Sequence, residues 1–171
     1  MMLGVSLSTF TLLHVIISLA GLGTGFIVLY GLLNSKRLDG WTAIFLTTTV
    51  LTSVTGFMFP FEGLKPSYIL AALSLVVLAV AIVARYSFHL AGAWRGTYVV
   101  TAAVGLYFNC FVAVVQAFAK IPALHAVAPT QKEPPFAIAQ LLVLAIFVWL
   151  SYLASKRFHM ETAQTVRSRA T

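Results

Sequence analysis

Long apolar runs separated by short polar segments dominate the pattern of this chain. Each run approaches the roughly 20 residues that a helix needs to cross the hydrocarbon core of a bilayer. Backbone groups in lipid must be hydrogen-bonded within their own segment, so these runs are expected to be helical. The predicted spans are residues 9–33, 41–59, 67–84, 97–119 and 136–155. The pattern therefore predicts an all-α, polytopic membrane bundle of five transmembrane helices within residues 1–158, followed by a polar cytoplasmic tail, residues 159–171.

Composition and charge agree with this interpretation. Hydrophobic residues make up 60% of the 171 residues and charged residues only 9%, whereas about a quarter of the residues in soluble domains are charged. The formal net charge is +7, but the basic residues stand at the ends of apolar runs and form no compact patch, which argues against a nucleic-acid partner.

The distribution of basic residues predicts an orientation. On one side of the predicted membrane lie Lys36, Arg37, Arg85, Arg95, Lys156, Arg157, Arg167 and Arg169, and on the other lie Lys65, Lys120 and Lys132. The positive-inside rule places the N-terminus outside and the C-terminus in the cytoplasm. Arg85 and His89 share the link between the third and fourth spans, where His89 is interpreted as a solvated interfacial histidine.

Small residues on the first span predict close packing. Gly21 and Gly25 form a GxxxG pair, which lets another helix approach its backbone. The one cysteine, Cys110, lies within the fourth span and allows neither an internal disulfide nor a thiolate metal cluster.

One face of the fourth span is polar or small along its whole length. At 100° per residue the stripe contains Tyr98, Ala102, Gly105, Asn109, Ala113, Gln116 and Lys120. An unpaired amide in hydrocarbon costs several kcal/mol, so the stripe is expected to face the bundle interior. Interhelical hydrogen bonding and ligand contact both remain open as the role of Asn109 and Gln116.

Several polar groups are predicted to meet near aromatic residues in the outer half of the bundle. The candidate ligand-binding residues are His14, Phe59, Glu62, Asn109, Gln116, Lys120, His125 and Gln140. Apolar walls with a few convergent polar groups are typical of small-molecule sites. The connection 121–135 contains four prolines of fixed φ, and an ordered lid is one interpretation of it. The spacing of the histidines and Glu62 is not specific for a metal, so no metal site is predicted.

Three segments resemble a set of small multi-pass bacterial inner-membrane proteins. They are ARYSFHLAGAWRGTYV, LYFNCFVAVVQAFAKIPAL and APTQKEPPFAIAQ, within Gly56–Phe158. The resemblance implies a location in the bacterial cytoplasmic (inner) membrane and carries no activity, cofactor or functional residue. The shorter run HLAGAWRGTYV is also similar to four-helix membrane families related to b-type cytochromes.

The sequence contains no recognisable nucleophile–base set and no sizeable soluble domain, so no reaction type is indicated. The leading hypothesis is a non-enzymatic accessory or assembly subunit. Its expected partners are the lipid bilayer and either another membrane protein or a second copy of the chain. A binder of a small apolar ligand, such as a lipid or a quinone, belongs to the same hypothesis.

Two alternatives remain open. A redox protein would bind haem or quinone, but a b-type haem needs two axial ligands at matched depth. His14 and His89 are predicted on opposite sides, and His14 meets His125 only if the loop folds inward. A transporter of small solutes or protons would use the Asn109 stripe, although such paths normally contain carboxylates or histidines at depth, and inverted repeats.

Overall fold

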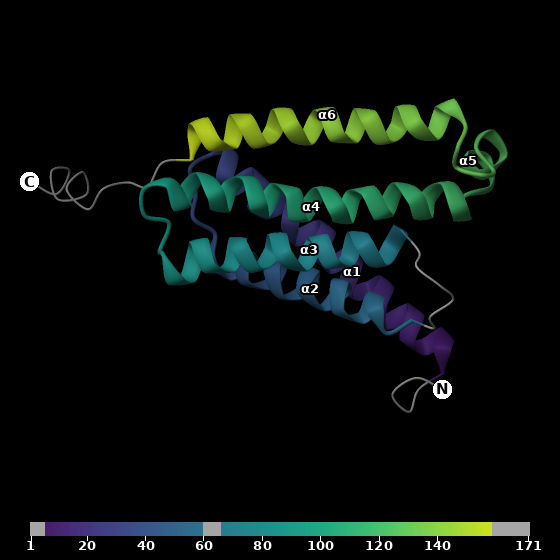
Figure 1. The fold of residues 1–171 in the computed structure, drawn as a ribbon, viewed down its shortest axis with the longest axis horizontal. Coiled ribbons are helices and arrows are strands. Elements are labelled where there is room, and N and C mark those ends of the chain that lie inside the picture. Colours follow the sequence, from purple (N-terminus) through teal and green to yellow (C-terminus); the bar gives the residue numbers. More distant parts are fainter. Residues whose placement is uncertain (1–5, 60–65, 159–171) are drawn as a thin grey trace, which may run out of the picture.

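The regular elements are all helices in the part of the chain that the structure describes, residues 6–59 and 66–158. The computed structural model contains, in order, α1 (Leu7–Leu33), α2 (Asp39–Phe57), α3 (Pro66–Ile82), the π-helical turn η1 (Val83–Ser87), α4 (Ala93–Lys120), α5 (Pro122–Val127) and α6 (Pro134–Arg157) (Figure 1). No strand occurs in these two ranges, so the all-α prediction is confirmed for them. The predicted tail, residues 159–171, lies outside the described residues.

Four of these helices are long and apolar enough to cross a membrane: α1, α3 continued by η1, α4 and α6. The second predicted span, residues 41–59, is not among them, although α2 forms there as a helix. Its composition explains the difference, because α2 begins at Asp39 and carries hydroxyls at Thr42, Thr47, Thr48, Thr49, Thr52, Ser53 and Thr55. Length and apolarity therefore support four candidate spans where the sequence predicted five.

Helix α4 lies at the centre of the arrangement. It packs against α3, α6 and α1, while α2 packs between α1 and α3. Helices α1 to α4 thus form a four-helix bundle, and α6 lies on the outside of it, against α4 and α1 (Figure 1). Helix α1 crosses the bundle obliquely, so its N-terminal end diverges from α4 and α6 (Figure 1).

The predicted close packing of α1 occurs at its glycines. A Cβ atom on Gly25 would lie 2.4 Å from Cδ1 of Leu106 and 2.9 Å from the ring of Phe45. Both neighbours are buried in the core. A Cβ atom on Gly21 would lie between 3.2 and 3.3 Å from the side chains of Thr48, Thr49 and Asn109. The GxxxG pair therefore brings α1 against both α2 and α4.

Candidate functional site

His14 and Phe59, two of the candidate residues, lie together at the contact between α1 and α2. Nδ1 of His14 is 2.7 Å from Oγ1 of Thr55, at hydrogen-bond distance. The Phe59 ring stands edge-on to the imidazole, with 5.1 Å between the ring centroids. Glu62, which was predicted nearby, lies outside the described residues.

Asn109 joins α4 to α2 in the middle of the bundle. Its Nδ2 donates a hydrogen bond to Oγ1 of Thr49 at 3.2 Å, and the Thr49 side chain is fully buried. The amide lies beside Gly21 of α1. Asn109 therefore occupies a junction of three helices, and its donor is used in helix–helix contact.

Gln140 is buried where α6 meets α4. Its Nε2 donates to the backbone oxygen of Phe111 at 3.2 Å. Its Oε1 is also buried, and it has no hydrogen-bond partner within residues 6–59 and 66–158. Near this end of α6 the rings of Phe118 and Phe136 pack edge-to-face at 5.4 Å. The amide nitrogen of Gln140 is therefore bonded, whereas its amide oxygen is buried without a partner in the described residues.

Gln116, Lys120 and His125 are exposed. The prediction of an inward-facing stripe on α4 holds for Tyr98 and Ala102, which are buried, but it is wrong for Gln116 and Lys120. The reason is the crossing angle of α1, which carries its N-terminal end away from this end of α4 (Figure 1). A helical stripe is covered only as far as a neighbouring helix runs beside it.

The described candidate residues therefore do not converge on one pocket. His14 and Phe59 lie on the α1–α2 side, Asn109 at mid-bundle, and Gln140 between α4 and α6. Ligand contact at any of these positions remains a prediction, whereas their hydrogen bonds and ring contacts join neighbouring helices.

The connection between α4 and α6 is ordered by a small hydrogen-bond network. Oε1 of Glu133 accepts from Oγ1 of Thr130 at 2.8 Å and from its backbone N–H at 3.3 Å, and Oε2 accepts from the N–H of Lys132 at 3.0 Å. Gln131 donates from Nε2 to the backbone oxygen of Val115 at 2.9 Å, which ties the turn to α4. Desolvation raises the pKa of the Glu133 carboxyl, but these hydrogen bonds outweigh it and hold the pKa below its usual value.

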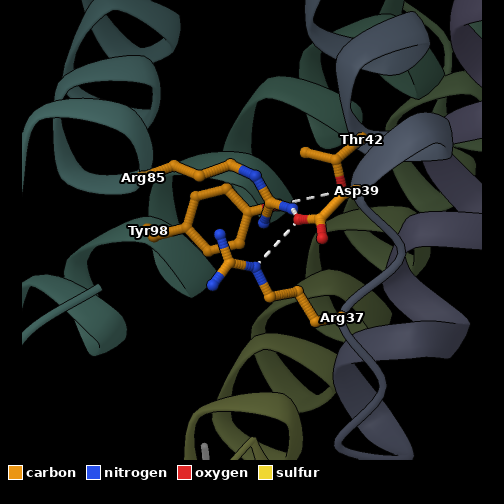
Figure 2. Close-up of polar contacts among 5 residues, drawn as sticks. All are labelled: Arg37, Asp39, Thr42, Arg85 and Tyr98. Carbon is orange, nitrogen blue, oxygen red and sulfur yellow. Dashed lines mark hydrogen bonds and ion pairs between the residues drawn. The ribbon is translucent and has the colours of Figure 1, made fainter. Parts of the chain in front are cut away.

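A cluster that the sequence did not predict lies at the opposite end of the bundle (Figure 2). Arg85 is only 2% exposed. Its Nη2 donates to Oδ1 of Asp39, and the same oxygen accepts from Nε of Arg37 at 2.8 Å. The Arg85 guanidinium also lies 5.1 Å from the ring centroid of Tyr98, a cation–π arrangement. The Tyr98 hydroxyl donates to Oγ1 of Thr42 at 3.5 Å.

Arg85 continues the buried face of α3, because Ser74, Leu78 and Ala81 precede it at helical spacing and are buried as well. Helix α3 widens into a π-helical turn at Val83–Ser87, in which Phe88 N–H bonds to Val83 O at 3.1 Å. Such a turn holds an extra residue and rotates the side chains that follow it. The apolar run of the sequence ends at residue 84, which predicted Arg85 in the link. Asp39 is the signal that was available, since it is one of only four acidic residues in the chain and lies just after Lys36 and Arg37, at the start of α2.

The cluster and the Asn109 contact are separated by apolar side chains. Phe45 and Leu46 lie between Thr42 and Thr49 along α2, and both are buried together with Leu106 of α4. The polar groups at the start and in the middle of α2 are therefore separated by a buried apolar layer.

The described histidines do not fit a b-type haem. His14 contacts Thr55 and Phe59, while His125 is exposed on α5, away from the diverging N-terminal end of α1 (Figure 1). His89 lies at the other end of the bundle, next to η1. Within the described residues, no group of three His, Cys, Asp or Glu side chains is placed to hold a metal ion.

Comparison with known proteins adds no relative to this description. Scans against protein-family models, functionally described proteins and solved structures gave no significant match.

Proposed function

We propose that the protein is integral to the bacterial inner membrane, with α2 as a fifth span. Helix α2 packs between α1 and α3, so it occupies the same layer as they do. Its hydroxyls do not require water: Thr48 and Thr55 donate to carbonyl oxygens four residues earlier, each at 2.7 Å. In this topology the N-terminus is outside, because one end of the bundle gathers Lys36, Arg37, Arg85, Arg95, Lys156 and Arg157.

Within that membrane the protein acts as a non-enzymatic accessory or assembly subunit. The observation that carries this proposal is the position of α6, which lies outside the four-helix bundle and has the smallest buried share of the candidate spans. Its outer face is apolar and slightly hollowed over Ala145, with Leu141, Leu144, Val148, Trp149 and Tyr152 around it. Such a face accepts the side chains of another membrane helix by close packing.

The interior polar groups support the same proposal. His14, Asn109 and Gln140 each contact a neighbouring helix by a hydrogen bond. Ser53 of α2 likewise donates to Ser74 of α3 at 3.1 Å. Interhelical bonds of this kind stabilise membrane bundles by about 0.6–2 kcal/mol each. In these bonds the polar side chains hold neighbouring helices together, which is a structural role and not a catalytic one.

Site-specific photo-crosslinking in the native host tests the accessory role. A crosslinker at Ala145 is expected to capture one defined membrane protein, which also co-purifies in fixed stoichiometry by native mass spectrometry. A crosslinker at Val76, an exposed position on α3, is the matched control. A strictly monomeric protein, or equal capture from both positions, contradicts the proposal.

A second candidate function rests on Gln140. Its buried Oε1, free of a partner in the described residues, can accept a hydrogen bond from the hydroxyl of a small apolar ligand such as a reduced quinone. An absorption spectrum and mass analysis of molecules that co-purify in mild detergent test this. A ligand retained by the wild type and lost from Gln140→Leu supports it, and identical extracts from both proteins contradict it.

Transport along the interior is the weaker alternative. The buried layer of Phe45, Leu46 and Leu106 interrupts the polar positions of α2, and proton relays in membranes normally use chains of Asp, Glu or His side chains. Equal flux into liposomes that contain wild-type protein, Asn109→Leu or no protein ends this hypothesis.

A further inference from the structure

The turn between α1 and α2 is built tightly against α1. Lys36 N–H bonds to Gly31 O at 2.8 Å, and a Cβ atom on Gly31 would lie 2.8 Å from Cδ1 of Leu38. The Ser35 hydroxyl donates to the backbone oxygen of Arg157, which fixes the turn to the end of α6. The backbone of Lys36 and Arg37 is therefore held in one place before any ligand arrives, which lowers the entropy lost on binding.

The charges around this turn are unbalanced. Asp39 is shared between two guanidinium groups, those of Arg37 and Arg85, through a single oxygen atom. The Arg85 side chain is buried, so water screens its charge poorly. Lys36 adds a further exposed ammonium group. Two guanidinium groups thus share one carboxylate, and the exposed basic side chains of the turn itself are those of Lys36 and Arg37.

Both exposed basic groups have unused donors. Within residues 6–59 and 66–158, the Arg37 guanidinium bonds to Asp39 through Nε alone, and the Lys36 side chain makes no hydrogen bond. A guanidinium with free Nη groups matches two oxygens of a phosphate, and an ammonium adds a third donor. These donors therefore fit a ligand that carries a phosphate group.

Aromatic side chains at the same level identify the source of that phosphate. Trp41 in the first turn of α2 and Tyr30 in the last turn of α1 are both exposed. Exposed Trp and Tyr at helix ends anchor in the headgroup region of a bilayer. This placement favours a phosphate of the membrane surface over a free phosphate ion.

We propose that Lys36 and Arg37 bind the phosphate group of an anionic membrane phospholipid, at a turn whose position is fixed by Gly31 and whose charge is raised by buried Arg85. The inference rests on the bundle lying in a membrane and not on the accessory role of α6.

Thermal unfolding of the full-length protein in mild detergent tests the site. Added phosphatidylglycerol is expected to raise the Tm of the wild type more than phosphatidylcholine does at the same concentration. Removing one positive charge near a membrane surface lowers the affinity about fivefold. Lys36→Gln and Arg37→Gln should each therefore shift the phosphatidylglycerol titration to higher concentration. Arg37→Lys should keep most of the affinity.

Lys132→Gln, an exposed charge at the other end of the bundle, is the matched control and should titrate as the wild type does. Lys36→Gln keeps the test decisive if Arg37→Gln weakens the fold, because the Lys36 side chain has no hydrogen bond to lose within the described residues. A full wild-type response from Lys36→Gln, or equal effects of the two lipids, overturns the proposal. Inorganic phosphate that produces the same Tm shift at the same concentration overturns the lipid as the source. Failure of the wild type to insert into vesicles is a separate result and contradicts the membrane location itself.

Discussion

The guanidinium of Arg85 and the carboxylate of Asp39 form an ion pair across 46 residues of sequence, joining the end of α3 to the start of α2. The two partners are unequal, because the Arg85 side chain is 2% exposed and the Asp39 side chain 65%. Losing Asp39 leaves a buried charge without a carboxylate, whereas losing Arg85 leaves a carboxylate that still has water and Arg37.

Asp39→Asn is therefore expected to destabilise the fold more than Arg85→Met. Breaking a fully buried pair from one side costs about 3–5 kcal/mol. Because Asp39 is exposed, water screens part of its interaction with Arg85, and a loss of about 1–3 kcal/mol in the free energy of unfolding is expected for Asp39→Asn. Unfolding by SDS in mixed micelles measures the difference. The double variant should be no less stable than Asp39→Asn alone, and a larger loss from Arg85→Met than from Asp39→Asn contradicts this ranking.

Gly25→Ala should destabilise the packing of α1. The new Cβ would lie 2.4 Å from Cδ1 of Leu106, and Leu106 and Phe45 are too well buried to move freely. Overpacking of this kind costs about 1–3 kcal/mol. Gly23→Ala, two residues away with nothing within 4 Å of its Cβ, is the control and should be neutral or slightly stabilising. The same unfolding assay compares the two, and equal stability of both variants contradicts the close packing.

The Asn109–Thr49 hydrogen bond should appear as a coupling energy. Asn109→Leu and Thr49→Val each remove one side of the 3.2 Å bond. A double-mutant cycle is expected to give a coupling of about 0.6–2 kcal/mol, the range of polar contacts between membrane helices. Additive effects within about 0.3 kcal/mol indicate that the two side chains do not interact.

The turn before α6 should loosen in acid. Hydrogen bonds hold the pKa of Glu133 below its usual value of 4.5, so the folded turn binds the proton less readily than the unfolded chain does. Its contribution to stability is therefore complete above about 4.5 and is lost as the pH falls through the lowered pKa. Amide hydrogen exchange at Thr130 and Lys132 across this range measures the change.

Glu133→Gln is the control for this effect. It removes the titrating group, so exchange at Thr130 and Lys132 should then show no transition in that pH window beyond the intrinsic pH dependence of exchange. A transition that persists in Glu133→Gln assigns the pH dependence to another group.

The helices themselves followed from the sequence because long apolar runs leave the backbone no other structure in lipid. The sequence predicted which side chains are buried only where a neighbouring helix runs beside the predicted face. Tyr98 and Ala102 are buried, as the stripe on α4 predicted, but Gln116 is exposed because α1 has diverged by that level. Crossing angles depend on the packing of both partners, and helical periodicity within one of them does not contain that information.

Arg85 shows a different limit of sequence reasoning. The end of the apolar run at residue 84 assigned it to the link, whereas it continues the buried face of Leu78 and Ala81 and contacts Tyr98 and Asp39. A pattern that counts apolar positions ends at the first charge, even where that charge lies on the buried face of the same helix. Asp39 at the start of α2 was the available signal, because a buried arginine needs an acidic partner and the chain has few acidic residues.

The order of the Arg85 partners along the chain has a consequence for biogenesis. A protein chain is made from its N-terminus, so Asp39 at the start of α2 is present before Arg85 is synthesised. Tyr98 follows with α4 and covers the guanidinium from the other side. The arginine therefore meets its counter-ion on arrival.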